Sequence, residues 1–185
     1  MTALFIVLAV AIVAVLAVVG IYNSLIGLRN QVKNSWSQIE VQLKRRHDLI
    51  PNLIESVKGY MQHERQTLEN LTKARSQAMS AEGVGEKAKA ESVLSGALGR
   101  LLVTVENYPD LKANQNFLAL QEELSSTENR IAFARQNYND QALSYNNKIQ
   151  MFPSNIIAGA FQFKTEEFFE LEEKGEKEVP KVSFS

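Results

Sequence analysis

The hydrophobic and polar positions divide the chain into an apolar start and a long amphipathic body. From Ala3 to Tyr22, 19 of 20 residues are hydrophobic, the exception being Gly20, and the first charged residue is Arg29. A helix needs about 20 apolar residues to cross the hydrocarbon core of a bilayer, so residues 1–22 are predicted to be a transmembrane anchor. A cleaved signal peptide is the alternative, but such a peptide has a basic residue before an apolar run of only about 7–15 residues.

Beyond the anchor, apolar residues recur at alternating steps of three and four, which is typical of a narrow, coiled-coil-like helical seam. This first seam extends from Val32 to Leu71 and predicts one long helix that continues from the anchor to about Met79. Pro51 removes one backbone hydrogen bond and predicts a kink near His47.

Two further helices follow the first. A glycine-containing turn at residues 81–85 separates the first helix from the second, and the second ends before Pro109. A third amphipathic helix is predicted from about residue 111 to residue 151, where Pro153 stops it. Every predicted element is a helix, so the predicted fold is all-α. Because short connections favour antiparallel neighbours, it is an N-terminal transmembrane helix that continues into an antiparallel bundle of three long helices over residues 23–152.

The remaining residues, 153–185, form a tail that is aromatic first and then acidic. The aromatic part, with Phe161, Phe163, Phe168 and Phe169, is a candidate for a short fourth helix. The acidic part is expected to be solvated.

Composition excludes several classes of function. The chain has 20 Lys and Arg, 21 Asp and Glu, and no Cys, so it has no disulfide framework, no thiolate zinc site and no cysteine nucleophile. A net charge of −1 argues against a nucleic-acid partner. His63-Glu64 is not a zincin motif because Thr67 stands where the second His would be. We therefore expect no enzyme activity, no metal and no cofactor.

Basic residues follow the anchor and none precedes it. By the positive-inside rule, the body should be cytoplasmic and the N-terminus outside. Anionic lipid would attract the basic residues nearest the anchor, which makes four of them candidate lipid contacts: Arg29, Lys33, Lys44 and Arg45.

Two surfaces of the first helix are candidates for self-association. Small residues at spacings of three and four predict a face for membrane-helix packing, namely Ala17, Gly20, Ser24 and Gly27. The helix to Met79 would also be longer than the third helix, about 87 Å against about 60 Å. The membrane-proximal seam would then lack cover within the chain and need a second copy, unless a kink at Pro51 folds it back. The residues of this predicted oligomer seam are Leu25, Val32, Trp36, Ile39 and Leu43.

Charged residues also fall in the seam positions. These are Arg46, Glu64, Glu128 and Arg135, and we expect them to pair between helices, Arg46 with Glu64 or Glu128. The alternative is that the string at residues 44–48 contacts lipid headgroups or a partner.

Long strings of this sequence resemble the LemA family of bacterial membrane proteins, above all residues 36–53, 108–114, 134–139 and 152–155. The resemblance covers nearly the whole chain. It implies a single N-terminal anchor, a helical cytoplasmic domain and no established catalytic activity. Some members of the family are associated with magnetosome membranes, which suggests a role in membrane organisation.

The function expected from these patterns is a membrane-anchored, non-catalytic, self-associating scaffold at the cytoplasmic face of the bacterial inner membrane. One alternative is an adaptor subunit that docks an unidentified protein partner. The other alternative is a sensor of the anionic lipid surface.

Overall fold

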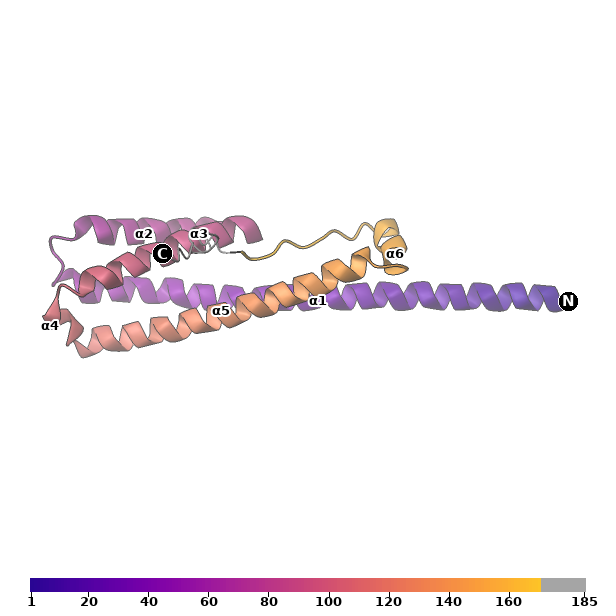
Figure 1. Cartoon of the computed structure of the whole chain (residues 1–185), viewed down its shortest axis with the longest axis horizontal. Helices are drawn as coiled ribbons and strands as arrows, with labels where there is room; N and C mark the ends of the chain where they lie inside the picture. Colours follow the sequence, from indigo (N-terminus) through magenta and orange to yellow (C-terminus); the bar gives the residue numbers. More distant parts are fainter. Residues whose placement is uncertain (171–185) are drawn as a thin grey trace, which may run out of the picture. The chain divides into compact units, whose positions relative to one another are not determined.

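The computed structural model describes residues 1–170, and all regular secondary structure in this part of the chain is helical (Figure 1). The all-α prediction is therefore confirmed. In chain order the helices are α1 (Thr2–Lys58), α2 (Arg65–Ser80), α3 (Val84–Val105), α4 (Pro109–Lys112), α5 (Gln115–Gln150) and α6 (Ser154–Ala160).

The chain divides into two compact units. Unit 1 consists of residues 1–42 and 130–168, and unit 2 consists of residues 43–129 together with Phe169 and Glu170. The helices α1 and α5 each contribute to both units.

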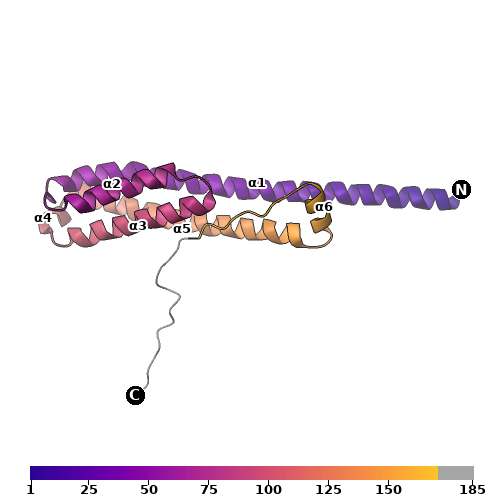
Figure 2. The same ribbon diagram turned by 90° about the horizontal axis from the view of Figure 1, so that it is seen from above.

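Unit 2 is a four-helix bundle that contains the end of α1, the start of α5, and α2 and α3 between them (Figure 2). Short turns reverse the chain after α1 and again at Gly83, whose φ of 77° is favourable for glycine. Burial of aliphatic side chains from all four helices provides the main favourable free energy of this unit. The core comprises Ile50, Leu53, Val57, Met61, Leu71, Ala74, Ala78, Leu94, Leu98, Leu101, Val105, Leu111, Phe117 and Leu124.

The predicted first helix is two helices. The helix α1 ends at Lys58, and the chain turns before α2 begins at Arg65. At the turn Met61 is buried and Tyr60 is 43% exposed. The three-and-four spacing continued across this turn because both helices present apolar residues to the same core.

The predicted third helix begins later than expected. Asn114 provides the cap of α5, since its side-chain oxygen accepts hydrogen bonds from the backbone N–H groups of Asn116 and Phe117 at 2.9 and 3.2 Å. Asp110, near the start predicted for this helix, lies in the first turn of the separate helix α4.

Unit 1 contains the anchor, the following part of α1, the second half of α5, α6 and an extended segment. The indole of Trp36 on α1 packs on the ring of Tyr138 on α5, with centroids 5.4 Å apart. The aromatic tail residues do not form the short fourth helix, because α6 precedes them. Instead Phe161 and Phe163 contact the ring of Tyr22 on α1.

Polar side chains of α5 hold the extended segment in unit 1. Asn146 donates to the carbonyl of Glu166 and accepts from its N–H, both at 2.9 Å. The hydroxyl of Tyr138 donates to the carbonyl of Glu167 at 2.8 Å. Burial, and then the nearby charges of Glu166 and Glu167, raise the pKa of Tyr138 to about 12. The acidic residues after Glu170 lie outside the described residues.

The helix α1 continues through Pro51 to Lys58, and the kink expected near His47 stays a prediction. Proline has no N–H, so the carbonyl of His47, four residues earlier, lacks its normal helical partner. Arg75 on α2 takes this place, since its Nε donates to the His47 carbonyl at 2.7 Å. The sequence predicted the missing bond, but only the packing of α2 against α1 could show what replaces it.

This contact predicts coupling between Arg75 and Pro51. Arg75→Met removes the donor and should lower the free energy of unfolding by about 1 kcal/mol, the usual net contribution of one hydrogen bond. In a Pro51→Ala background the residue at 51 can donate to His47, so the same substitution should cost less. Urea denaturation of the detergent-solubilised chain, followed by circular dichroism, measures both costs. Equal costs in the two backgrounds would show that Arg75 does not act on the freed carbonyl.

Candidate functional site

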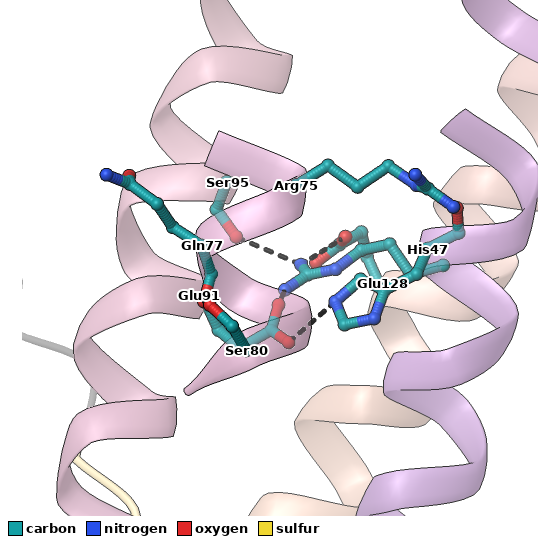
Figure 3. Close-up of polar contacts among 8 residues, drawn as sticks. His47, Arg75, Gln77, Ser80, Glu91, Ser95 and Glu128 are labelled. Carbon is teal, nitrogen blue, oxygen red and sulfur yellow. Dashed lines mark hydrogen bonds and ion pairs between the residues drawn. The ribbon is translucent and has the colours of Figure 1, made fainter. Parts of the chain in front are cut away.

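The most unusual group of side chains is a buried polar cluster in unit 2 (Figure 3). It consists of Arg46 and His47 on α1, Glu91 and Ser95 on α3, and Glu128 on α5. Arg46 and Glu91 are 2% and 1% exposed, respectively. The cluster therefore places charge inside a core that is otherwise apolar.

The arginine lies at the centre of this cluster. Its Nη2 donates to Oε2 of Glu91, and its Nη1 donates to Glu128 at 2.6 Å and to the hydroxyl of Ser95 at 3.0 Å. The other oxygen of Glu91 lies 2.8 Å from Nε2 of His47. Both oxygens of the buried carboxylate are thus hydrogen bonded, as a buried charge requires.

Helical spacing explains how each residue reaches the cluster. Arg46 lies three residues after the buried Leu43 and four before the buried Ile50, in the seam that the sequence identified. Glu91 was not identified from the sequence. It lies three residues after the buried Ala88 and three before the buried Leu94, so its position belongs to the buried face of α3. This spacing was the signal in the sequence from which the burial of Glu91 could have been predicted.

The two buried charges stabilise each other. Burial alone would lower the pKa of Arg46, but the charges of Glu128 and Glu91 outweigh it, and the pKa is raised above its ordinary value. Burial alone would raise the pKa of Glu91. The hydrogen bond from His47 and the charge of Arg46 outweigh that effect and lower the pKa.

This arrangement joins helices. The described residues contain no group of three or more His, Cys, Asp or Glu side chains that could hold a metal ion. The cluster ties α1 to α3 and α5, and Arg75 ties α1 to α2. Since a displacement of one turn would leave Arg46 buried without a carboxylate, the cluster fixes the register of α1 in the bundle.

The polar seam predicted from sequence is only partly assembled. Arg46 and Glu128 do pair. Glu64 lies instead 3.5 Å from the hydroxyl of Tyr108, and Arg135 is half-buried with no ion-pair partner among residues 1–170.

The four candidate lipid contacts have different surroundings. The guanidinium of Arg29 lies over the ring of Phe163, 5.3 Å from its centroid, and Lys33 is exposed. Lys44 pairs with Asp48 at 3.1 Å, and Arg45 pairs with Glu123. The latter two are thus engaged with acidic residues of the same chain.

The predicted oligomer seam is already covered within a single chain. Its members Leu25, Val32, Ile39 and Leu43 are each at most 2% exposed, and Trp36 packs on Tyr138. The expectation that this seam lacked intrachain cover is therefore wrong. The comparison of the lengths of the first and third helices was misleading for two reasons. The first helix ends at Lys58, and α6 and the segment after it also pack in unit 1.

Other surfaces of unit 1 do remain exposed. The small residues of the predicted membrane-packing face, Ala17, Gly20, Ser24 and Gly27, are all exposed. A groove of about 570 Å³ also lies between α1 and α5, and the sequence did not indicate it. Its two large apolar side chains, Val41 and Phe133, are 62% and 75% exposed.

Comparison with known proteins identifies the family. The model of the LemA family matches residues 35–184, which is most of the chain and begins beyond the anchor. The chain belongs to the LemA family. The resemblance seen in the sequence is thereby confirmed.

Named relatives include Protein LemA of Metamycoplasma hominis, 34% identical over 76% of this chain and 64% of that protein. The chain thus matches less than two thirds of that relative's length. Magnetosome protein MamQ 2 of Paramagnetospirillum magneticum is 26% identical over 92% of this chain and 75% of that protein. Magnetosome protein MamQ of Magnetospirillum gryphiswaldense is 24% identical over 85% and 68%. Together with the apolar start of α1, of which no part is buried, these relatives indicate a membrane-associated protein of the LemA family.

The buried pair predicts unequal effects of removing its two carboxylates. Glu91→Gln should lower the free energy of unfolding by about 3 kcal/mol or more, because it leaves Arg46 buried without its buried counter-charge. Glu128→Gln is the matched control and should cost less, since the side chain of Glu128 is 43% exposed and solvent compensates part of the loss. Urea denaturation at pH 7 measures both. Equal costs would contradict the central role of Glu91.

The lowered pKa of Glu91 predicts a defined loss of stability in acid. Because folding favours the carboxylate form, this stabilisation is complete above the ordinary glutamate pKa of about 4.3 and is lost as the pH falls through the lower folded value. The free energy of unfolding of the wild-type chain should therefore fall more steeply between pH 6 and pH 3 than that of Glu91→Gln. Parallel pH profiles for the two chains would contradict the assignment.

Proposed function

We propose that this protein is a membrane-anchored, non-catalytic scaffold of the bacterial inner membrane. The N-terminus lies outside and the helical body is cytoplasmic, where copies of the chain associate. The observation that carries the proposal is the continuity of α1 within unit 1. The same helix that presents an exposed apolar surface to lipid continues without a linker into residues packed against α5. Such a body is held at a fixed height above the bilayer, as a scaffold requires.

The relatives support this proposal in two ways. The family match begins at residue 35, so the helical body is the part that the family shares. The relatives named as magnetosome proteins match 92% and 85% of this chain, which extends the similarity toward the anchor. A protein that organises membranes needs an anchor and a body, and both are present here.

The exposed surface of unit 1 supports association between copies. Val41 and Phe133 form an apolar patch beside Gln38 and Arg130 in the groove between α1 and α5. Covering such a patch with the same patch of a second copy would remove apolar area from water. The second candidate function, an adaptor, uses the same groove for a different protein.

Single-cysteine variants test orientation and association, because the natural chain has no Cys. A membrane-impermeant maleimide should label Thr2→Cys in intact spheroplasts, and should label Val103→Cys only after lysis. Bismaleimide treatment of native membranes should join copies of Phe133→Cys into dimers. Val103→Cys is the matched control for cross-linking, since Val103 is 71% exposed but lies outside the groove.

Three outcomes would contradict parts of this proposal. Labelling of Val103→Cys in intact spheroplasts would overturn the orientation. A cross-link from Phe133→Cys to a stoichiometric foreign protein would favour the adaptor. Equal dimer yields at Phe133 and Val103 would show collision in the membrane and remove the case for the groove.

A further inference from the structure

A group of apolar side chains in unit 1 is exposed where a soluble protein would bury it. Met151, Phe152, Ile156 and Phe161 lie at the end of α5 and around α6, and each is between 55% and 79% exposed. These four residues lie between positions 151 and 161, and exposed apolar side chains this close together mark a contact with a partner or a membrane. Packing in the core of the protein does not account for the exposure of these four side chains.

The helix α6 leaves one of its two isoleucines exposed. Ser154 and Ala158, four apart, are buried and Ile157 is half-buried, whereas Ile156 is 60% exposed. A helix in water would turn Ile156 toward the protein. The orientation of α6 is the one expected if its outer face meets an apolar environment.

The position of this group relative to the anchor identifies that environment. Tyr22 is the last residue of the apolar run, and 20 helical residues span about 30 Å, the thickness of the hydrocarbon core. Tyr22 therefore lies at the edge of that core. The ring of Phe161 is 4.8 Å from the ring of Tyr22, and Phe163 is 5.9 Å from it, so α6 lies at the same depth.

The next charged residue continues the same order. Arg29 lies seven residues beyond Tyr22, about 10 Å along α1, and its guanidinium covers the ring of Phe163. An aromatic layer followed by a basic residue is the arrangement found at membrane–water interfaces. Lys164, next to Phe163 in sequence, is exposed and adds a second positive charge.

We propose that residues 151–161 form a second contact with the bilayer, beside the anchor. The side chains of Met151, Phe152, Ile156 and Phe161 enter the interfacial layer of the lipid, while the buried side of α6 packs on the protein. This inference rests on the proposed membrane anchorage, and it adds that the body touches the membrane through α6. The occupant of this surface is thus lipid.

Backbone hydrogen bonds make the insertion physically acceptable. The N–H of Asn155 donates to the carbonyl of Met151 at 2.9 Å, and that of Phe161 donates to Ile157 at 3.0 Å. The N–H of Phe163 donates to Ala158 at 2.9 Å. Each backbone group that is paired in this way loses little when the segment leaves water.

Two attachment points would restrict the body more than one. A single helix can rotate about its own axis in the bilayer. A second contact at α6 would stop that rotation, so that the face of unit 1 formed by α1 and α5 keeps one direction relative to the membrane plane.

Fluorescence quenching in proteoliposomes tests the contact. The full chain carries one cysteine labelled with an NBD fluorophore, in vesicles of phosphatidylcholine and phosphatidylglycerol with or without a lipid that carries a nitroxide near its headgroup. Ile156→Cys and Met151→Cys should be quenched at least twofold by the nitroxide lipid. Phe133→Cys is the matched control, because it is 75% exposed in the same unit but faces Gln38 and Val41.

Helix geometry places the control away from the lipid. Gln38 lies 16 residues beyond Tyr22 on α1, about 24 Å along the helix, so a label at Phe133 should show almost no quenching. Val10→Cys, inside the anchor, is the reporter for anchorage and should be quenched by a nitroxide placed deep in the acyl chain.

The four variants separate the possible failures. If Val10→Cys is quenched but Ile156→Cys behaves like Phe133→Cys, the second contact does not exist and the anchor stands. If Val10→Cys is not quenched, the proposed membrane anchorage itself fails. A blue-shifted label at Ile156 that lipid nitroxide does not quench would show that protein, such as a second copy, covers α6, which also overturns the inference.

Discussion

The buried guanidinium of Arg46 is the constraint on which unit 2 depends. A charge that is almost completely removed from water is tolerable only when carboxylates and further hydrogen bonds replace the water. Glu91 and Glu128 provide the carboxylates, from two other helices. Aliphatic side chains such as Leu53 and Leu94 supply most of the burial, but they could pack in several registers. The charged cluster admits one register, since only one brings the three helices together with their charges paired.

The same helix meets a second constraint at Pro51. A proline inside a helix leaves a carbonyl without a donor, and in the interior of a bundle water cannot replace it. Arg75 provides that donor for the carbonyl of His47. The helix α1 therefore stays continuous in a place where a proline alone would favour a break. The buried charge of Arg46 and the unpaired carbonyl of His47 lie at adjacent residues of α1, and side chains of different helices form hydrogen bonds with them.

Unit 1 uses other means to cover the helix near the membrane. The ring of Tyr138 packs on Trp36, and its hydroxyl holds the extended segment after α6. Asn146 holds the same segment through two hydrogen bonds to one residue. This return of the chain places aromatic residues around Tyr22, at the point where α1 leaves the apolar region. The anchor, the covered helix and the aromatic group thus all belong to unit 1.

The sequence alone determined the features that depend on local periodicity and composition. The apolar run from Ala3 to Tyr22, the helical class and the seam position of Arg46 all follow from residue spacing within one helix. Tertiary structure decided the features that depend on which helices meet. The break after Lys58 was hidden because Met61 keeps the core apolar across the turn. Glu91 was hidden because a single acidic residue on an apolar face gains its meaning only from the arginine of another helix.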